Sequence, residues 1–244
     1  MRYNGVDIRT VHPAISVNKE IYPGAARREV VTVRGNRREI YAGHRSEQSE
    51  AVIRVNIAGR TRDEAYEVRA LLAAWAASSG EATAMLEPTH WQGKAYEAVL
   101  SEISEPEYIF GHTTVDVVFA LPDGRAYDLA ESMASGEGGV NMMIGGSDKA
   151  TLIITQIMSG ATSGLTWTMD GERILKLKSS YKAASGAKIV ADFASGSLTA
   201  DGTHIEAQID YTASTWQPRT TPGEHALTSN NAGTIEARWR NRWI

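Results

Sequence analysis

The side chains that could carry out chemistry are spread along this sequence without the spacing that catalysis or metal binding requires. The six histidines form no HExxH motif and no other i, i+4 ligand pair; they are at positions 12, 44, 90, 112, 204 and 225. The serines lie in no GxSxG nucleophile elbow. The acidic pairs Glu102/Glu105 and Asp170/Glu172 could be glycosidase carboxylates, but both fall at predicted strand ends or turns, where solvated charge is usual. The sequence therefore predicts no catalytic residue, no metal site, no cofactor and no enzyme activity.

One polar stretch, residues 35–48, has side chains suited to binding another protein. It follows a predicted strand at 29–34 and is bracketed by Gly35 and Gly43, which predicts a long hairpin tip or a projecting loop. Arginine forms bidentate pairs with carboxylates, and an apolar pair within an exposed polar loop favours a partner. We predict an arm at about 34–48 that contacts a neighbouring subunit; its interface residues are Arg34, Arg37, Arg38, Ile40, Tyr41, His44 and Arg45. The alternative is a solvated hairpin tip.

Aromatic residues in the second half of the chain allow another function. Trp167, Trp216, Tyr181 and Tyr211 all fall there. An exposed tryptophan over a sugar ring is typical of a lectin, which would make this half a carbohydrate-binding module. The alternative is that these rings form the core of a β-sandwich.

The composition is that of a folded protein and excludes several functional classes. The chain has 244 residues, 42% hydrophobic and 22% charged, which suffices for two domains. It has a net charge of −4 and no basic excess in either half, so we expect no nucleic acid binding. No apolar run is long enough for a transmembrane helix, and the start lacks the apolar region of a secretory signal. The absence of cysteine excludes disulfides and fits synthesis in a reducing cytoplasm.

The first half is predicted to be mainly β with one helix. Thr61 and Glu64 have the spacing of a capping box, and Gly80 suits a helix end. We therefore predict a helix at 62–79 with one apolar face: Ala65, Val68, Leu72, Trp75 and Ala76. Further strands are expected at 51–57, where polar and apolar residues alternate, and at 84–86, 96–103 and 113–120. Residues 1–131 then form a small β-barrel or sandwich on which the helix packs.

The second half is predicted to be strands and turns. Residues 132–141 are rich in glycine and poor in charge, which favours a linker; a phosphate-binding loop lacks the strand–loop–helix context here. Residues 142–244 are expected to form a β-sandwich, with strands at 150–157, 165–169, 174–177, 188–193, 197–199, 205–211 and 234–244. The Asp170-Gly171 and Asp201-Gly202 pairs predict tight turns.

The order of these segments resembles the distal tail protein family of long-tailed, non-contractile (siphovirus) phages. The segments that carry the resemblance are YNGVDI (3–8), VVTVRGNRREIYAG (30–43), AVIRVNIAGRTRDEAYEVRALLAAW (51–75), AYEAVLSEISEPEYIFGHTTVDVVFALPD (95–123), and the end from PGEHALT to ARWRNRWI (222–244). They span almost the whole chain, but they share an order of features and contain no invariant motif.

The resemblance implies a split β-barrel with one packed helix, followed by a galectin-like β-sandwich. It implies a homohexameric ring at the virion tail tip, made in the host cytoplasm, that joins the tail tube protein to tail-tip (tail-associated) proteins or the baseplate. The arm hairpin would embrace the next subunit, and the sandwich could anchor a receptor-binding protein. The second domain is short, which weakens the expectation of an extra arm for host-binding proteins. The galectin likeness is one of shape, so it assigns no sugar-binding residue.

Overall fold

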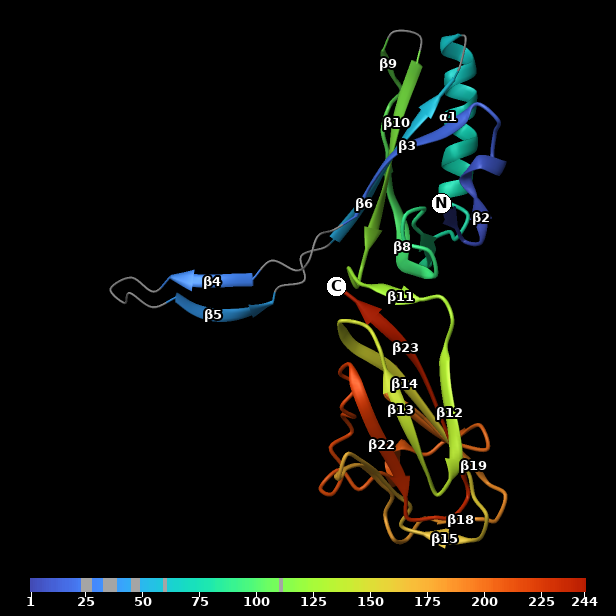
Figure 1. The fold of residues 1–244 in the computed structure, drawn as a ribbon. Helices are drawn as coiled ribbons and strands as arrows, with labels where there is room; N and C mark the ends of the chain where they lie inside the picture. Colours follow the sequence, from blue (N-terminus) through green and yellow to red (C-terminus); the bar gives the residue numbers. More distant parts are fainter. Residues whose placement is uncertain (23–27, 33–38, 45–48, 59–60, 110–111) are drawn as a thin grey trace. The chain divides into compact units, whose positions relative to one another are not determined.

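The computed structural model describes residues 1–22, 28–32, 39–44, 49–58, 61–109 and 112–244, with only the backbone at 28–32, 39–44, 109 and 112. The chain forms two compact units, Met1–Tyr127 with Ile244, and Asp128–Trp243. The division falls a few residues before the predicted boundary at 131. Within the described ranges the protein is mainly β with a single α-helix, which confirms the predicted fold class (Figure 1).

Unit 1 contains a helix, a large antiparallel sheet and a separate two-stranded sheet. Its elements are β1 (Arg2–Tyr3), β2 (Val6–Asp7), η1 (Ile8–Thr10), β3 (Ile15–Ile21), β4 (Arg28–Thr32), β5 (Glu39–His44), β6 (Ser49–Ile57), α1 (Arg62–Ala76), β7 (Ala84–Glu87), β8 (Lys94–Ile103), β9 (Glu107–Ile109), β10 (His112–Leu121) and β11 (Ala126–Asp128). Central strand β6 pairs with β3 on one side and β10 on the other. Strand β10 also pairs with β8, which leads through β7 to β1 and β2.

The predicted amphipathic elements form the core of unit 1. Ala51, Ile53, Val55 and Ile57 of β6 are fully buried, which confirms the alternation read from the sequence. The apolar face predicted for α1 is also the buried face. Trp75 packs edge-on against Phe119 of β10, and its indole nitrogen donates to the Val6 carbonyl at 3.0 Å.

Helix α1 begins as predicted and ends earlier. The Thr61 side chain accepts from the Glu64 amide while the Glu64 carboxylate accepts from the Thr61 amide, so both halves of the capping box are present. The helix ends at Ala76, three residues before the predicted end at 79. The reason is a change of hydrogen bonding: the Ser78 amide donates to the Trp75 carbonyl, which tightens the last turn, and Gly80 has a φ of +64° in the turn that follows.

Unit 2 contains two larger antiparallel sheets and a third sheet of two short strands. Its strands are β12 (Ser132–Glu137), β13 (Gly139–Ile144), β14 (Asp148–Ile157), β15 (Thr162–Ser163), β16 (Thr166–Met169), β17 (Glu172–Lys176), β18 (Lys182–Ala183), β19 (Lys188–Asp192), β20 (Ser197–Ala200), β21 (Thr203–His204), β22 (Gly223–Ser229) and β23 (Thr234–Trp243), with η2 at Glu206–Gln208. One sheet has the order β12-β23-β14-β19-β20-β21 and the other β13-β22-β16-β17. They share one core that includes Leu152, Trp167, Ile189, Leu227 and Ile235.

The predicted linker at 132–141 is wrong, because these residues belong to strands. Strand β12 pairs along its length with β23, and β13 pairs with β22. The glycines serve the connection between the two strands. Gly138 has a φ of +66°, and a Cβ on Gly136 would lie 2.3 Å from the Gly139 carbonyl oxygen. Glycine permits backbone conformations and close backbone contacts that other residues do not, and here these properties serve a tight turn and not a flexible linker.

The predicted strand at 205–211 is also wrong. Residues 206–208 form the short helix η2, and Tyr211 is 62% exposed. The chain then runs along the edge of β17: the amides of Asp210, Thr215 and Trp216 donate to carbonyls of that strand. Alternation in the sequence therefore marks an irregular segment that covers a sheet edge.

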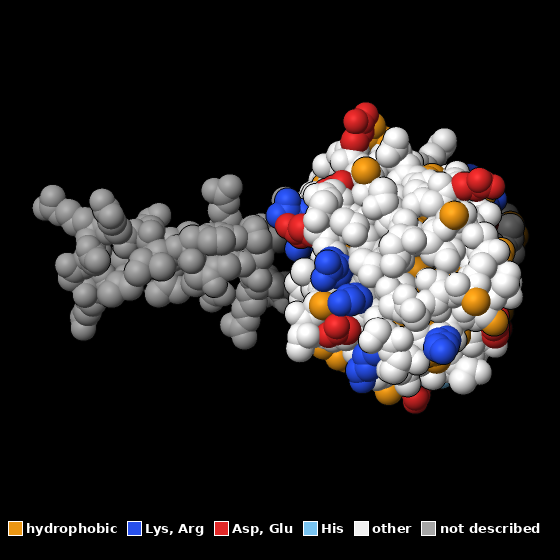
Figure 2. Space-filling model, turned by 90° about the horizontal axis from the view of Figure 1, so that it is seen from below, with side chains coloured by type: hydrophobic (Ala, Val, Ile, Leu, Met, Phe, Trp, Pro, Cys, Tyr) orange, Lys and Arg blue, Asp and Glu red, His pale blue; other side chains and the backbone are white. Residues whose placement is uncertain are grey.

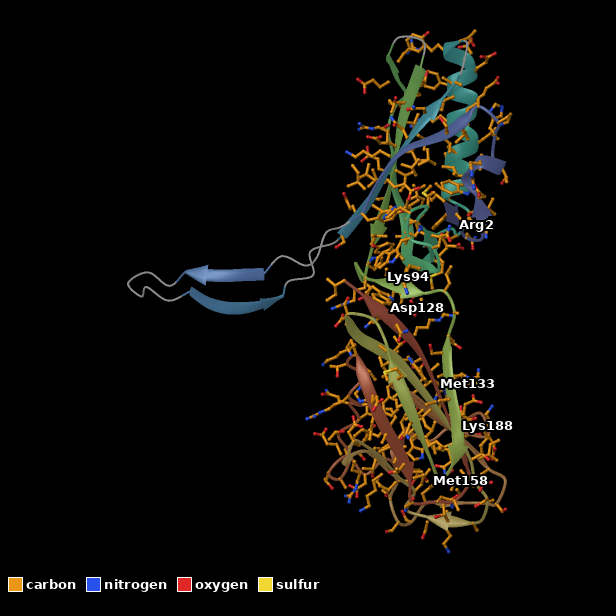
Figure 3. The ribbon with its side chains drawn as sticks, viewed as in Figure 1. Arg2, Lys94, Asp128, Met133, Met158 and Lys188 are labelled. Carbon is orange, nitrogen blue, oxygen red and sulfur yellow. The ribbon has the colours of Figure 1, made fainter. Side chains whose placement is uncertain are left out.

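The remaining strand predictions are close to the observed elements. Asp170 and Gly171 both have positive φ between β16 and β17, and Asp201 and Gly202 do so between β20 and β21. Strand β22 was not predicted. The end of β23 is held by Asp128, whose carboxylate accepts from Asn241 at 2.7 Å and from the Trp243 indole at 2.8 Å (Figure 3).

Candidate subunit-interface hairpin

The residues predicted to form the interface arm fall in the segment that contains strands β4 and β5. Arg34, Arg37, Arg38 and Arg45 lie outside the described residues. Ile40, Tyr41 and His44 lie in β5, of which the backbone is described. The arm was predicted as a tip that starts near residue 34, whereas the paired backbone starts at Arg28, because β4 is one side of the hairpin and β5 the other.

The hairpin has a defined register and forms a sheet of its own. Val30 is opposite Tyr41 and Val31 is opposite Ile40, and the register shifts by one residue between Glu29 and Val30. Among the described strands, β4 and β5 pair with each other alone (Figure 1). A two-stranded hairpin is at best marginally stable in water unless a further surface covers it.

A buried carboxylate lies where β3 leads toward the hairpin. The side chain of Glu20 is only 7% exposed. Its oxygens accept from the amide and the hydroxyl of Thr89, at 3.0 and 2.5 Å, and from the Tyr22 hydroxyl at 3.2 Å. Nδ1 of His90 lies 3.5 Å away.

A β-bulge in β3 turns Glu20 inward. Val17 is opposite Val55 and Lys19 is opposite Arg54, so Asn18 is the extra residue. Because side chains alternate along a strand, one inserted residue moves every later side chain to the other face. Glu20 is thereby opposite Ile53, which is fully buried.

Tyr22 completes this cluster. Its ring stacks on Tyr96 of β8, with centroids 5.1 Å apart and planes 9° apart, and lies near the His90 ring. Burial of the phenol, together with the neighbouring negative charge of Glu20, raises the pKa of Tyr22 far above its ordinary value. The hydroxyl therefore stays protonated and donates to Glu20.

The start of β6 is fixed by pairing on the other side of the hairpin segment. Ser49 is opposite Leu121 and Glu50 is opposite Ala120. Gly124 has a φ of +63°, and a Cβ there would lie 2.7 Å from the Ser49 hydroxyl oxygen. Strands β3 and β6, which precede and follow the β4–β5 hairpin in the chain, thus belong to the same sheet.

Glu20, Tyr22 and Thr89 were not predicted as site residues. Glu20 and Thr89 are 69 positions apart, and the bulge that brings them together has no signature in the sequence. An acidic residue in a β-strand is normally interpreted as solvent-facing, so no pattern would have singled out Glu20.

The aromatic residues of unit 2 that could bind a sugar differ in their exposure. Trp167 is fully buried, and its indole nitrogen donates to the side-chain oxygen of Gln156 at 2.5 Å. Trp216 is partly buried, with its ring centroid 4.9 Å from that of Phe193. Tyr211 is exposed, and none of the described ring contacts joins it to Trp216. Trp167 therefore belongs to the core.

The metal-ligating side chains among the described residues are dispersed. No group of three or more His, Asp or Glu side chains among them is placed to hold a metal ion. On the face in Figure 2, basic and acidic side chains are interspersed over a mostly uncharged surface. No helix in the described ranges is long and apolar enough to cross a membrane.

Comparison with known proteins gives a match at the level of structure. No family model matches the sequence, and no curated protein does. The crystal structure of SPP1 Dit (gp 19.1), described as a paradigm of the hub adsorption apparatus in phages that infect Gram-positive bacteria, aligns with a TM-score of 0.82. The identity is 12%, over 100% of this chain and 98% of that one. This protein has the fold of SPP1 Dit.

Two further structures are less similar. Chains of the phage P2 baseplate in its activated conformation, with Ca and with Sr, give TM-scores of 0.49 and 0.48 at 9% and 10% identity. Each covers 93% of this chain and 90% of the other. Similarities of this size do not by themselves establish a common fold.

Proposed function

We propose that this protein is a structural hub of a phage tail tip, which assembles as a homohexameric ring between the tail tube and the tip or baseplate proteins. The observation that carries the proposal is the whole-chain likeness to SPP1 Dit, with a TM-score of 0.82 over both units. At 12% identity this likeness establishes the fold alone, and the ring and its partners are part of the proposal. No catalytic activity or cofactor forms part of the proposal.

The β4–β5 hairpin supports a ring built through an arm. It is a separate two-stranded sheet among the described strands, and such a hairpin gains stability when another surface covers it. An arm on one subunit that binds a different surface of the next is a heterologous contact, which closes into a ring when the rotation between subunits permits. The predicted arm residues, from Arg34 to Arg45, would make this contact.

The proposed partners follow from the position of a hub. One face of the ring would bind the tail tube protein and the other a tail-associated protein, while unit 2 could hold a receptor-binding protein. A role in nucleic acid binding or membrane insertion is not proposed. The alternative function, a carbohydrate-binding module, loses one of its two candidate tryptophans because Trp167 lies in the core.

The mass of the purified protein tests this proposal. We expect mass photometry to show a species six times the 26.5 kDa chain mass, and negative-stain images to show closed rings. A monomer at all concentrations, even when tail tube and tail-associated proteins are present, would contradict the proposal. A glycan-binding assay on the same preparation gives no signal if unit 2 is only an attachment domain.

A further inference from the structure

The last residues of β3 are held more tightly than the end of an edge strand requires. Strand β3 pairs with β6 alone among the described strands, and the end of such a strand normally frays. Here the bulge at Asn18 turns Glu20 into the interior, where a carboxylate is costly unless all its oxygens are satisfied. The hydrogen bonds of Glu20 must therefore compensate for the loss of solvent around its carboxylate.

The partners of Glu20 explain why a carboxylate suits this place. The Thr89 amide, the Thr89 hydroxyl and the Tyr22 hydroxyl all donate, and together they use both oxygens of Glu20. The Thr89 hydroxyl oxygen itself accepts from the amino group of Met1 at 2.9 Å, so its own hydrogen is free for Glu20. An amide in place of the carboxylate would point an N–H group at donors.

We infer that Glu20 is the positioning residue of the β4–β5 hairpin: through Thr89 and Tyr22 it fixes the point at which the chain leaves the main sheet of unit 1 toward β4. Thr89 lies in the β7–β8 connection, and the Tyr22 ring is stacked on Tyr96 of β8. The last described residues before the hairpin are thus fastened to β8 and to the β7–β8 connection of the same sheet. The consequence for ring assembly rests on the proposed function, whereas the consequence for the hairpin itself does not.

Spin-label distances test this inference in a single protomer. The chain contains no cysteine, so cysteines introduced at Thr32 in β4 and at exposed Ala74 in α1 are the only labelling sites. In protein diluted below its assembly concentration, we expect Glu20→Gln to broaden the distance distribution about twofold, because the strand end opens locally. Thr89→Val, which removes the hydroxyl at nearly constant volume, should broaden it less.

Asp116→Asn is the matched control. Asp116 lies in the same sheet and accepts two hydrogen bonds from Arg54, at 2.8 Å each, but this ion pair is exposed on the other face. Arg54 is opposite Lys19, whereas Glu20 is opposite the buried Ile53. The substitution makes the same chemical change from carboxylate to amide. We expect it to leave the distance distribution as in the wild type.

Two results would contradict the role of Glu20, and a third would contradict the proposed function alone. An unchanged distribution in Glu20→Gln overturns the positioning role, whether or not rings form. Loss of the helical circular dichroism signal in both Glu20→Gln and Thr89→Val also overturns it, since Glu20 would then support unit 1 as a whole. If the wild type never forms rings, the proposed function fails while the distances still decide the role of Glu20. If rings do form, Glu20→Gln should raise the protein concentration at which half of the chains are in rings. The expected rise is about tenfold, the factor for the loss of one charge-assisted hydrogen bond.

Discussion

His225 and Asp170 form an ion pair that fastens the β16–β17 turn to strand β22. Nδ1 of His225 lies 2.6 Å from the Asp170 carboxylate, and Nε2 lies 2.6 Å from the Thr221 carbonyl oxygen. Carboxylates and carbonyls only accept hydrogen bonds, so both ring nitrogens donate and the imidazole carries a positive charge. The second Asp170 oxygen accepts from the Ala226 amide at 2.8 Å. With only 7% of its side chain exposed, His225 is a nearly buried cation.

The stability of unit 2 is expected to depend on pH through this pair. Burial alone would lower the pKa of His225, but the hydrogen bonds to Asp170 and Thr221 raise it above 6.5. Burial would likewise raise the pKa of Asp170, but His225 and the Ala226 amide hold it below 3.8. The His225 contribution to the free energy of unfolding is complete below pH 6.5 and lost as pH rises through the raised pKa. The Asp170 contribution is complete above pH 3.8 and lost as pH falls through the lowered pKa.

Urea unfolding of the wild type and His225→Gln, followed by tryptophan fluorescence, measures this effect. Between pH 3.8 and 6.5 the variant should be less stable by about 1.5–3 kcal/mol, the range for hydrogen bonds to charged groups. The difference should shrink at alkaline pH, as the pH rises through the raised pKa of His225 and the ring loses its proton. His204→Gln is the control, because that histidine is 70% exposed beside Glu206. An equal difference at both pH values would show that His225 is not protonated in the folded state.

Removing the acceptor of the buried indole is expected to destabilise unit 2. Gln156 is fully buried, and its side-chain oxygen accepts from Trp167 and from the Ser229 hydroxyl at 2.9 Å. Gln156→Leu leaves both donors without a partner, at a cost of about 1–3 kcal/mol in the free energy of unfolding. Chemical denaturation measures the loss. Gln217→Leu makes the same change at an exposed position and should alter stability by less than about 0.5 kcal/mol.

Helix α1 should depend on its N-terminal capping box. Thr61→Ala removes the oxygen that accepts from the Glu64 amide at 3.2 Å, and loss of such a cap costs about 1 kcal/mol. Thermal unfolding followed by circular dichroism should show a lower midpoint for the unit 1 transition. Thr61→Ser keeps the hydroxyl and should behave as the wild type; equal losses in the two variants would argue against the cap.

The predicted arm should contribute to assembly and not to folding. Replacing Arg34, Arg37 and Arg38 together by Glu reverses the charges proposed to pair with carboxylates of the next subunit. We expect the variant to fold with an unchanged circular dichroism spectrum but to form fewer rings at a given concentration, as seen by mass photometry.

A charge-matched control distinguishes an interface from a general effect of net charge. Lys149, Arg173 and Lys182 are exposed residues of unit 2, and changing all three to Glu alters the net charge of the chain by the same amount. This control should assemble normally. Ring formation that is equally weak in both triple variants would contradict a specific role for the arm.

Local interactions explain which parts of the structure could be predicted. The Thr61–Glu64 cap, the alternation in β6 and the Asp-Gly turns each depend on neighbours within a few positions, so residue order alone determines them. The burial of Trp75 and Trp167 follows from the size of their apolar surface. The linker prediction failed because glycine permits both flexible and tightly turned backbone, and only strand pairing distinguishes the two.

The sequence by itself determined a mainly β chain with one capped helix, two halves of different character and a charged segment that resembles an interface arm. Tertiary structure alone decided which charges are buried. Glu20 meets Thr89 across 69 positions because of a bulge, and His225 meets Asp170 across 55 because two strands pair. Removing a charged group from water destabilises the fold unless the group has hydrogen-bonding partners. Strand register determines which partners it meets, and no local sequence pattern encodes that register.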